Sequence, residues 1–143
     1  MTRFLFLVSL SIMLTNASCH TPKDKQINAA EKDQALYKKY NLDKIKLPEG
    51  FAVSVYAEVS NARSMCWGAK GTLFVGNSRE DNVYAVVDVN NDGKVDSVYT
   101  IAQDLVMPNG VAFKDGSLFV SALDKIYRYD NIEDNLSNPP TTV

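Results

Sequence analysis

The chain has 143 residues, the length of one ordinary domain. Hydrophobic residues make up 45% of it, enough to build a core, so a globally disordered protein is excluded. The net charge of −2 is unevenly spread: residues 23–46 carry seven lysines against four acids, and residues 47–143 carry seven basic residues against thirteen acids. The acidic larger part argues against nucleic acid as a partner and suits cations or small neutral ligands.

Residues 1–18 have the features of an export signal. After a basic start, the apolar run Phe4–Leu14 is long enough for a signal core and too short to span a bilayer. Two small residues then precede Cys19, an arrangement that resembles a bacterial lipoprotein signal in which Cys19 would be the lipidated N-terminus. Asn16 stands where leucine is usual, and ordinary secretion with cleavage near Ser18 is the alternative. Both interpretations predict an exported protein, either periplasmic or held as a lipoprotein at the outer membrane or cell surface.

Residues 19–46 are predicted to form a polar linker. Helix-forming residues fill 29–40, with Ala35, Leu36 and Tyr40 roughly on one face, so a short helix is expected there. The lysines of this segment could lie against an anionic membrane, although a solvated linker is the more common role of such a sequence. A turn at Leu47–Gly50 leads into residues 51–57, where alternating apolar residues predict a half-buried strand.

Residues from 63 onward contain an internal repeat. Three segments recur after 45, 46 and 42 residues respectively: Lys70–Val75 as Asp115–Val120, Met65–Trp67 as Val111–Phe113, and Val83–Asp88 as Lys125–Asp130. A period of about 40–50 residues with several short strands in each unit is the signature of β-propeller blades. Four large aromatic residues at matching positions are expected in the core between blades: Trp67, Phe74, Phe113 and Phe119.

The repeat predicts an all-β fold of the β-propeller type, with about two blades in residues 47–143. Blade one is expected over 63–101, an incomplete blade two over 108–143, and 51–57 as a leading strand of the kind that completes the last blade of a propeller. The expected strands lie near 65–67, 73–75, 83–87, 95–101, 111–113, 118–120, 126–129 and 141–143. Because propellers close with about 4–8 blades, we expect either the N-terminal fragment of a longer protein or a short chain that assembles through its open edges.

One loop has the composition of a calcium site. It reads DVNNDGKVD, with oxygen-bearing side chains at positions 1, 3, 5 and 9 and a glycine at position 6 that permits a sharp turn. The four candidate metal ligands are Asp88, Asn90, Asp92 and Asp96. The pattern resembles the DxDxDGxxD loops in hairpins of integrin-type propellers, and a bound calcium would be structural. A plain polar hairpin turn is the alternative, because Asn-Asp-Gly is favourable turn chemistry without a metal.

Two residues are candidates for the mouth of a central channel. Asn109, in the run Met107–Phe113, immediately precedes an expected innermost strand, and Arg63 occupies the matching place in blade one. Asn109 could contact a ligand or simply turn the chain between blades, and Arg63 could meet an anionic ligand or cap strand carbonyls. His20 is the only histidine and sits beside the export signal, so the propeller part offers no histidine base.

Taken together, these motifs resemble the start of the sorbosone dehydrogenase family, which is related to the soluble glucose dehydrogenases that use pyrroloquinoline quinone (PQQ). The resemblance covers residues 47–134 and is carried by the runs LPEGF, NARSM, TLFVG, DVNNDGKVD and MPNGVAF. It implies a six-bladed propeller, secreted or lipid-anchored, that oxidises a sugar or aldose-type substrate. PQQ would accept the hydride, a histidine the proton, and Ca²⁺ would bind and polarise the cofactor.

The resemblance also implies what is missing. The catalytic histidine, the basic residues around PQQ and its calcium ligands would come from later blades, so whether this chain is itself an enzyme is uncertain. Asn109 and Arg63 are the cofactor-binding candidates that carry over. Two other functions remain open from the residues: a non-enzymatic cell-surface propeller that binds carbohydrate or protein, and a gluconolactonase-type propeller with a metal in its channel.

Overall fold

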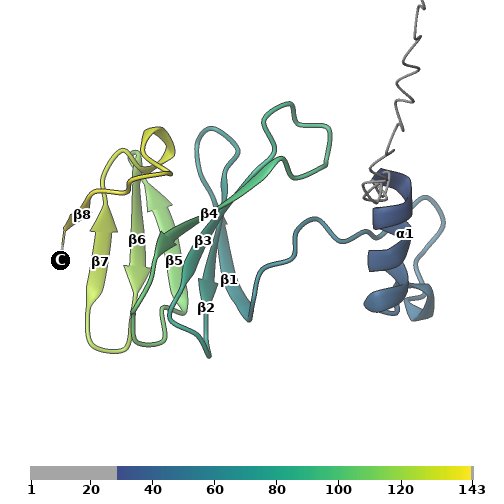
Figure 1. Cartoon of the computed structure of the whole chain (residues 1–143), viewed down its shortest axis with the longest axis horizontal. Helices are drawn as coiled ribbons and strands as arrows, with labels where there is room; N and C mark the ends of the chain where they lie inside the picture. Colours follow the sequence, from purple (N-terminus) through teal and green to yellow (C-terminus); the bar gives the residue numbers. More distant parts are fainter. Residues whose placement is uncertain (1–28, 143) are drawn as a thin grey trace, which may run out of the picture.

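The computed structural model describes residues 29–142 and consists mainly of two antiparallel β-sheets (Figure 1). The first sheet contains β1 (Ala62–Trp67), β2 (Leu73–Asn77), β3 (Val83–Val87) and β4 (Ser97–Ala102). The second contains β5 (Gly110–Lys114), β6 (Ser117–Ser121), β7 (Ile126–Tyr129) and β8 (Thr141–Thr142). In both sheets the spatial order follows the sequence, so each is a meander of four strands. The predicted all-β class is confirmed, and all eight strands lie within two or three residues of their expected positions.

Within residues 29–142, helical structure is confined to short pieces outside the sheets. The expected helix is α1 (Ala29–Lys39), which has Glu31 in its first turn and Lys38 and Lys39 in its last, a favourable charge order for the helix dipole. Two 3₁₀ turns follow along the chain, η1 (Leu42–Lys44) and η2 (Ile132–Asp134). Within residues 29–142 no helix has the length and apolar character needed to cross a membrane. The export signal and Cys19 lie outside the described residues.

The strand pairing shifts the predicted alignment of β3 with β7 by one residue. Phe74 pairs with Ala85 in the first sheet, and the matching Phe119 pairs with Arg128 in the second. Ala85 therefore corresponds to Arg128, which is 43 residues later rather than the 42 predicted from the sequence (85 to 128). The predicted alignment matched Asp88 with Asp130 because both are acids. The two residues are not at equivalent positions, since Asp130 comes one residue earlier relative to its strand than Asp88 does.

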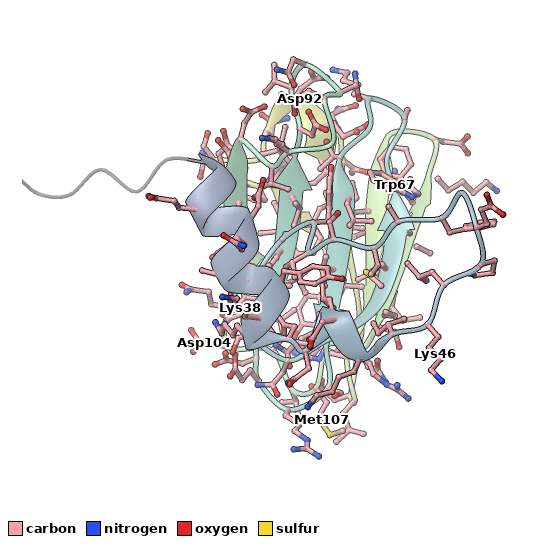
Figure 2. The ribbon with its side chains drawn as sticks, turned by 90° about the vertical axis from the view of Figure 1, so that its right-hand side faces the viewer. Lys38, Lys46, Trp67, Asp92, Asp104 and Met107 are labelled. Atoms are coloured by element: carbon pink, nitrogen blue, oxygen red, sulfur yellow. The ribbon has the colours of Figure 1, made fainter. Side chains whose placement is uncertain are left out.

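The predicted leading strand over 51–57 has no partner in the described part of the chain, and its pairing with a last blade stays a prediction. Val53, Val55 and Ala57 are half-buried as the alternation predicted, whereas Phe51 is 72% exposed. The segment instead crosses in front of the first sheet on its way from α1 to β1 (Figure 2). The ring of Tyr56 meets that of Trp67 edge-on, with centroids 6.3 Å apart. The segment thus contacts the sheet through the Tyr56 side chain, without backbone pairing.

The core lies between the two sheets. The first sheet turns Cys66, Phe74 and Ala85 toward the second, since the register aligns these residues on one face. The second sheet contributes apolar side chains to the same core. The buried residues of this core are Phe74, Val83, Ala85, Ile101, Leu105, Leu118, Val120, Tyr129 and Ile132. The first strand of each sheet, β1 and β5, lie side by side in this interface. That neighbourhood brings the starts of the two repeats together.

Candidate functional site

Arg63 and Asn109 lie at the same end of the two sheets. Arg63 is the second residue of β1, Asn109 directly precedes β5, and these two strands are neighbours. Both residues are exposed, and neither side chain takes part in a hydrogen bond or ion pair within the described residues. We call this end of the two sheets the rim. A guanidinium and an amide are therefore available for a ligand there.

The loop that carries Asn109 is clamped against the first sheet. The hydroxyl of Ser64 donates to the carbonyl oxygen of Asn109, and the backbone N–H of Asn77 donates to that of Pro108 (2.9 Å). Gly76 makes this close approach possible, because a Cβ there would lie 2.6 Å from the Asn109 oxygen and 2.7 Å from the Pro108 oxygen. The role of Gly76 was missed in the sequence, although a glycine inside a strand often marks a close backbone contact.

Asn77 organises the neighbouring loop instead of facing a ligand. Its side chain is fully buried; its Oδ1 accepts hydrogen bonds from the backbone N–H groups of Arg79 (2.9 Å) and Glu80 (2.7 Å), and its Nδ2 donates to the carbonyl oxygen of Ser60 (2.9 Å). The carboxylate of Glu80 in turn accepts from Ser60 Oγ (2.8 Å) and Asn61 Nδ2 (2.6 Å). These bonds fix the chain just before Arg63, so the rim is ordered on both sides of the candidate site.

The rim also exposes apolar side chains on a strained loop. Val106, Met107 and Leu123 are 51%, 49% and 73% exposed, and the backbone N–H of Leu123 donates to the carbonyl oxygen of Val106 (2.8 Å). Asp104 and Met107 have φ values of +59° and +48°, a conformation that non-glycine residues adopt rarely and at a cost. Strain and exposed apolar groups beside Asn109 are features of a surface that contacts another molecule.

The acidic loop between β3 and β4 is held by its own side chains. Asp88, 9% exposed, accepts hydrogen bonds from the backbone N–H groups of Asp92 (3.2 Å) and Gly93 (2.9 Å). Asp96 accepts one from Val89 (2.8 Å), and Asp92 one from Lys94 (2.8 Å). Asn90 Oδ1 accepts a further bond from the Asp92 N–H (3.1 Å). Gly93 has a φ of +81°, as the sharp turn requires.

These bonds turn the loop into a self-supporting hairpin end. Among residues 29–142 no group of three or more histidine, cysteine or acidic side chains is arranged to hold a metal ion. The predicted ligands thus serve the backbone in this conformation, and calcium binding by the loop stays a prediction. The loop still affects its surroundings, because burial chiefly, and then the charges of Asp88 and Asp96, raise the pKa of Tyr56.

A groove of about 590 Å³ lies between this loop, β4, the segment 54–58 and α1. Its walls are tied together at the surface. Lys94 Nζ is 3.7 Å from Asp33 Oδ2 of α1, and Glu58 accepts hydrogen bonds from Lys39 (2.5 Å) and Tyr40 (2.8 Å). Neither Arg63 nor Asn109 lines this groove. The sequence contains no signal for it, because the groove forms only through the position of α1 beside β4.

At the end opposite the rim, hydrogen bonds of Glu133 and an ion pair of Asp134 join the two sheets, a contact that we call the clasp. Glu133, in η2, accepts hydrogen bonds from the backbone N–H groups of Lys70 (2.9 and 3.1 Å) and Thr72 (3.4 Å) in the turn between β1 and β2. The ammonium group of Lys70 pairs with Asp134. The clasp joins residues more than sixty positions apart, so it holds the second repeat in one orientation on the first.

Comparison with known proteins identifies the family. Residues 38–139 match the family described as a domain of unknown function, DUF7133. The chain belongs to the DUF7133 family. The matched range begins in α1 and ends just before β8, so it includes η1, the crossing segment, the first sheet and strands β5, β6 and β7 of the second.

One curated protein is similar to this DUF7133 chain over part of its own length. A protein of Borreliella burgdorferi, named as an uncharacterized protein, is 27% identical over 95 residues, which are 65% of this chain and 23% of that protein. The chain thus spans less than a quarter of the length of this curated relative. No solved structure matches the chain.

Proposed function

We propose that this DUF7133 chain forms the first two blades of an exported β-propeller that oxidises a sugar or aldose-type substrate with PQQ. The observation that carries the proposal is the side-by-side start of two successive four-stranded meanders, with Arg63 and Asn109 at that end. In a propeller the first strand of each blade lines the central channel, and ligands bind at the channel mouth. The two exposed donors would then face the ligand of the assembled ring.

The residues present fit part of such a cofactor site. PQQ carries carboxylates and carbonyl oxygens, which accept hydrogen bonds from a guanidinium and an amide. Arg63 and Asn109 supply these two donors, unpaired within the described residues and backed by the clamped loop around Pro108 and Gly76. When bound, PQQ would supply the hydride acceptor, and this chain would contribute orientation of the cofactor rather than proton transfer.

The remaining chemistry belongs to other parts of the proposed propeller. A base for the substrate proton, further cations around PQQ and oxygen ligands for Ca²⁺ are required by the mechanism that the resemblance implies. The described residues hold no histidine and no metal-ligating cluster, so the proposal assigns those groups to further blades. The relative from Borreliella burgdorferi, of which this chain covers 23%, is long enough for a propeller to close.

A cofactor titration of the protein from the complete gene tests the assignment. The apoprotein is titrated with PQQ in the presence of Ca²⁺, and binding is followed by the absorbance of the quinone. We expect saturable binding that weakens at least tenfold in Arg63→Gln and several-fold in Asn109→Ala, because each loses a direct contact. Arg79→Gln, an exposed arginine on the neighbouring loop, is the matched control and should bind like the parent. Equal affinity of all three variants would remove Arg63 and Asn109 from the site.

A second candidate is a cell-surface propeller that binds carbohydrate or protein without catalysis. The exposed rim of Val106, Met107 and Leu123 beside Asn109 favours it, since an apolar surface contributes to binding more than to hydride transfer. Replacement of Met107 and Leu123 by serine discriminates the two functions. Loss of glycan or protein capture with unchanged PQQ affinity supports the binding module, whereas unchanged capture excludes it.

A further inference from the structure

The loop after η1 presents apolar side chains to solvent. Ile45, Leu47 and Phe51 are 47%, 42% and 72% exposed. The backbone N–H of Phe51 donates to the carbonyl oxygen of Pro48 (3.2 Å), and Gly50 has a φ of +85°, so a tight turn separates Leu47 from Phe51. The turn keeps the two apolar residues close to each other at one tip. Large apolar side chains gathered at a tip mark a surface that meets another apolar phase or a partner.

Several lysines precede this tip in the sequence. Residues 37–51 contain four lysines and two acids, Asp43 and Glu49, and the exposed Glu49 stands in the turn itself. Lys39 is engaged by Glu58, whereas Lys38, Lys44 and Lys46 form no ion pair within residues 29–142. The three free ammonium groups are therefore available to an external anion.

The basic residues and the apolar tip belong to one side of the molecule. Figure 1 shows α1 apart from the two sheets, at one end of the structure. In Figure 2, which views the molecule from that end, Lys38 and Lys46 both lie on the foremost layer formed by α1 and the chain after it. We call the surface of Lys38, Lys44, Ile45, Lys46, Leu47 and Phe51 the basic loop face.

The two sheets and their loops have the opposite charge. Residues 62–143 carry seven basic residues against eleven acids, a net −4. A molecule that is basic at one end and acidic in its body is oriented by an anionic surface, with the basic end toward that surface and the body away from it. Such steering acts over roughly a Debye length, about 8–10 Å at moderate salt.

We propose that the basic loop face binds an anionic lipid bilayer surface. Lysines near such a surface each contribute electrostatic attraction, and apolar side chains at a tip insert below the headgroups. A nucleic acid would satisfy the lysines but not the exposed Ile45, Leu47 and Phe51. The combination fits a membrane interface, and it is independent of whether the propeller binds PQQ.

Vesicle binding of the full chain tests the proposal, with Cys19→Ala in every sample so that no lipid is attached. Sedimentation with phosphatidylcholine vesicles is compared with sedimentation with vesicles containing 30% phosphatidylglycerol. Residues 1–18 are present in all samples, so any binding by their apolar run is a common background. We expect the anionic vesicles to bind the chain more tightly, and Lys44→Glu/Lys46→Glu to lower that affinity at least tenfold.

Lys114→Glu/Lys125→Glu is the matched control, because it changes the net charge equally at exposed lysines of the second sheet. It should stay within about twofold of the parent, and Phe51→Ser should weaken binding at low and high salt alike. Equal losses in the two double variants would show a general charge effect and overturn the proposal. So would equal binding to neutral and anionic vesicles. Concentration-dependent dimerisation that Phe51→Ser abolishes, with no lipid preference, would assign the tip to a second copy of the chain instead.

Discussion

The ring of Phe74 on β2 stacks on the ring of Phe113 on β5, with centroids 5.9 Å apart and planes inclined by 11°. This pair joins the two repeats through their core faces, and Phe74 is fully buried in it. The corresponding rings on the outer faces are not stacked on another ring, and Trp67 meets Tyr56 only edge-on. Trp67, which matches Phe113, is 60% exposed, and Phe119, which matches Phe74, is half-buried under the guanidinium of Arg128.

The stacked pair predicts unequal costs for equivalent mutations. Phe74→Ala should lower the free energy of unfolding by about 3–5 kcal/mol, because it empties a fully buried site. Phe119→Ala, the same substitution at the matching position of the second repeat, should cost about half as much or less, since that ring is already partly in water. Urea denaturation followed by circular dichroism measures both. Equal losses would mean that the outer face of the second sheet is covered in solution.

The clasp at Glu133 predicts a second contrast. Glu133→Ala leaves the backbone N–H groups of Lys70 and Thr72 without their acceptor and should cost about 1–3 kcal/mol. Asp134→Ala removes only the exposed ion pair with Lys70 and should cost less than about 1 kcal/mol. Both are read from thermal unfolding of the full chain. A larger effect for Asp134 than for Glu133 would contradict the clasp.

The attachment of α1 should depend on pH at both extremes. The hydrogen bonds from Lys39 and then Tyr40 hold the pKa of Glu58 below its ordinary value of 4.5, and the hydrogen bond to Glu58 raises the pKa of Lys39 above 10.5. The stabilisation from Glu58 is therefore complete above about pH 4.5 and is lost as the pH falls through its lower folded pKa. The stabilisation from Lys39 is complete below about pH 10.5 and is lost as the pH rises through its higher folded pKa.

The single tryptophan reports on this attachment, because Trp67 touches Tyr56, two residues from Glu58. Its fluorescence should be constant between about pH 5 and 10 and change outside that range, before global unfolding. In Glu58→Gln the acid step should disappear. An acid step that survives in this variant would have to come from another carboxylate, and the contact with Lys39 would then not hold the segment in place.

The acidic loop predicts a calcium response that separates its two interpretations. If the loop binds Ca²⁺, millimolar calcium should raise the Tm of the full chain, and Asp92→Ala, which removes an exposed carboxylate, should abolish the rise. Asp81→Ala, an exposed acid in another loop, is the control and should keep it. No rise in the parent would leave the loop as a polar hairpin turn, held by its own hydrogen bonds.

The strands were predictable because their signals are local. Short β-branched and aromatic runs bounded by turn residues marked all eight, and the repeat grouped them into two units. The alignment of β3 with β7 was predicted one residue out of register. It matched Asp88 with Asp130, whereas the strand pairing makes Tyr84 equivalent to Tyr127. The aromatic residues illustrate the same limit: Phe74 and Phe113 are in the core as expected, but Trp67 is 60% exposed, because only the segment at Tyr56 covers it on the outer face.

The segment 51–57 and the rim were less predictable for a related reason. Alternation in 51–57 marked Val53, Val55 and Ala57 as half-buried but also Phe51, which is 72% exposed. A strand also needs a backbone partner, and alternation says nothing about one. Arg63 and Asn109 lie at the same end of neighbouring strands, as their matching places in the two repeats imply, and their position at a channel mouth stays a prediction. The clamp that fixes Asn109 was not foreseen, because Ser64, Gly76 and Asn77 act through contacts between repeats that no local pattern records.

The most direct test of the proposed function is a dye-linked dehydrogenase assay on the protein from the complete gene. The apoprotein is reconstituted with PQQ and Ca²⁺, and dye reduction is measured with a panel of aldoses. The proposal predicts sugar-dependent dye reduction that requires PQQ and falls at least tenfold in Arg63→Gln. Absence of any PQQ-dependent turnover, in a protein that is folded and does not bind the quinone, would contradict it.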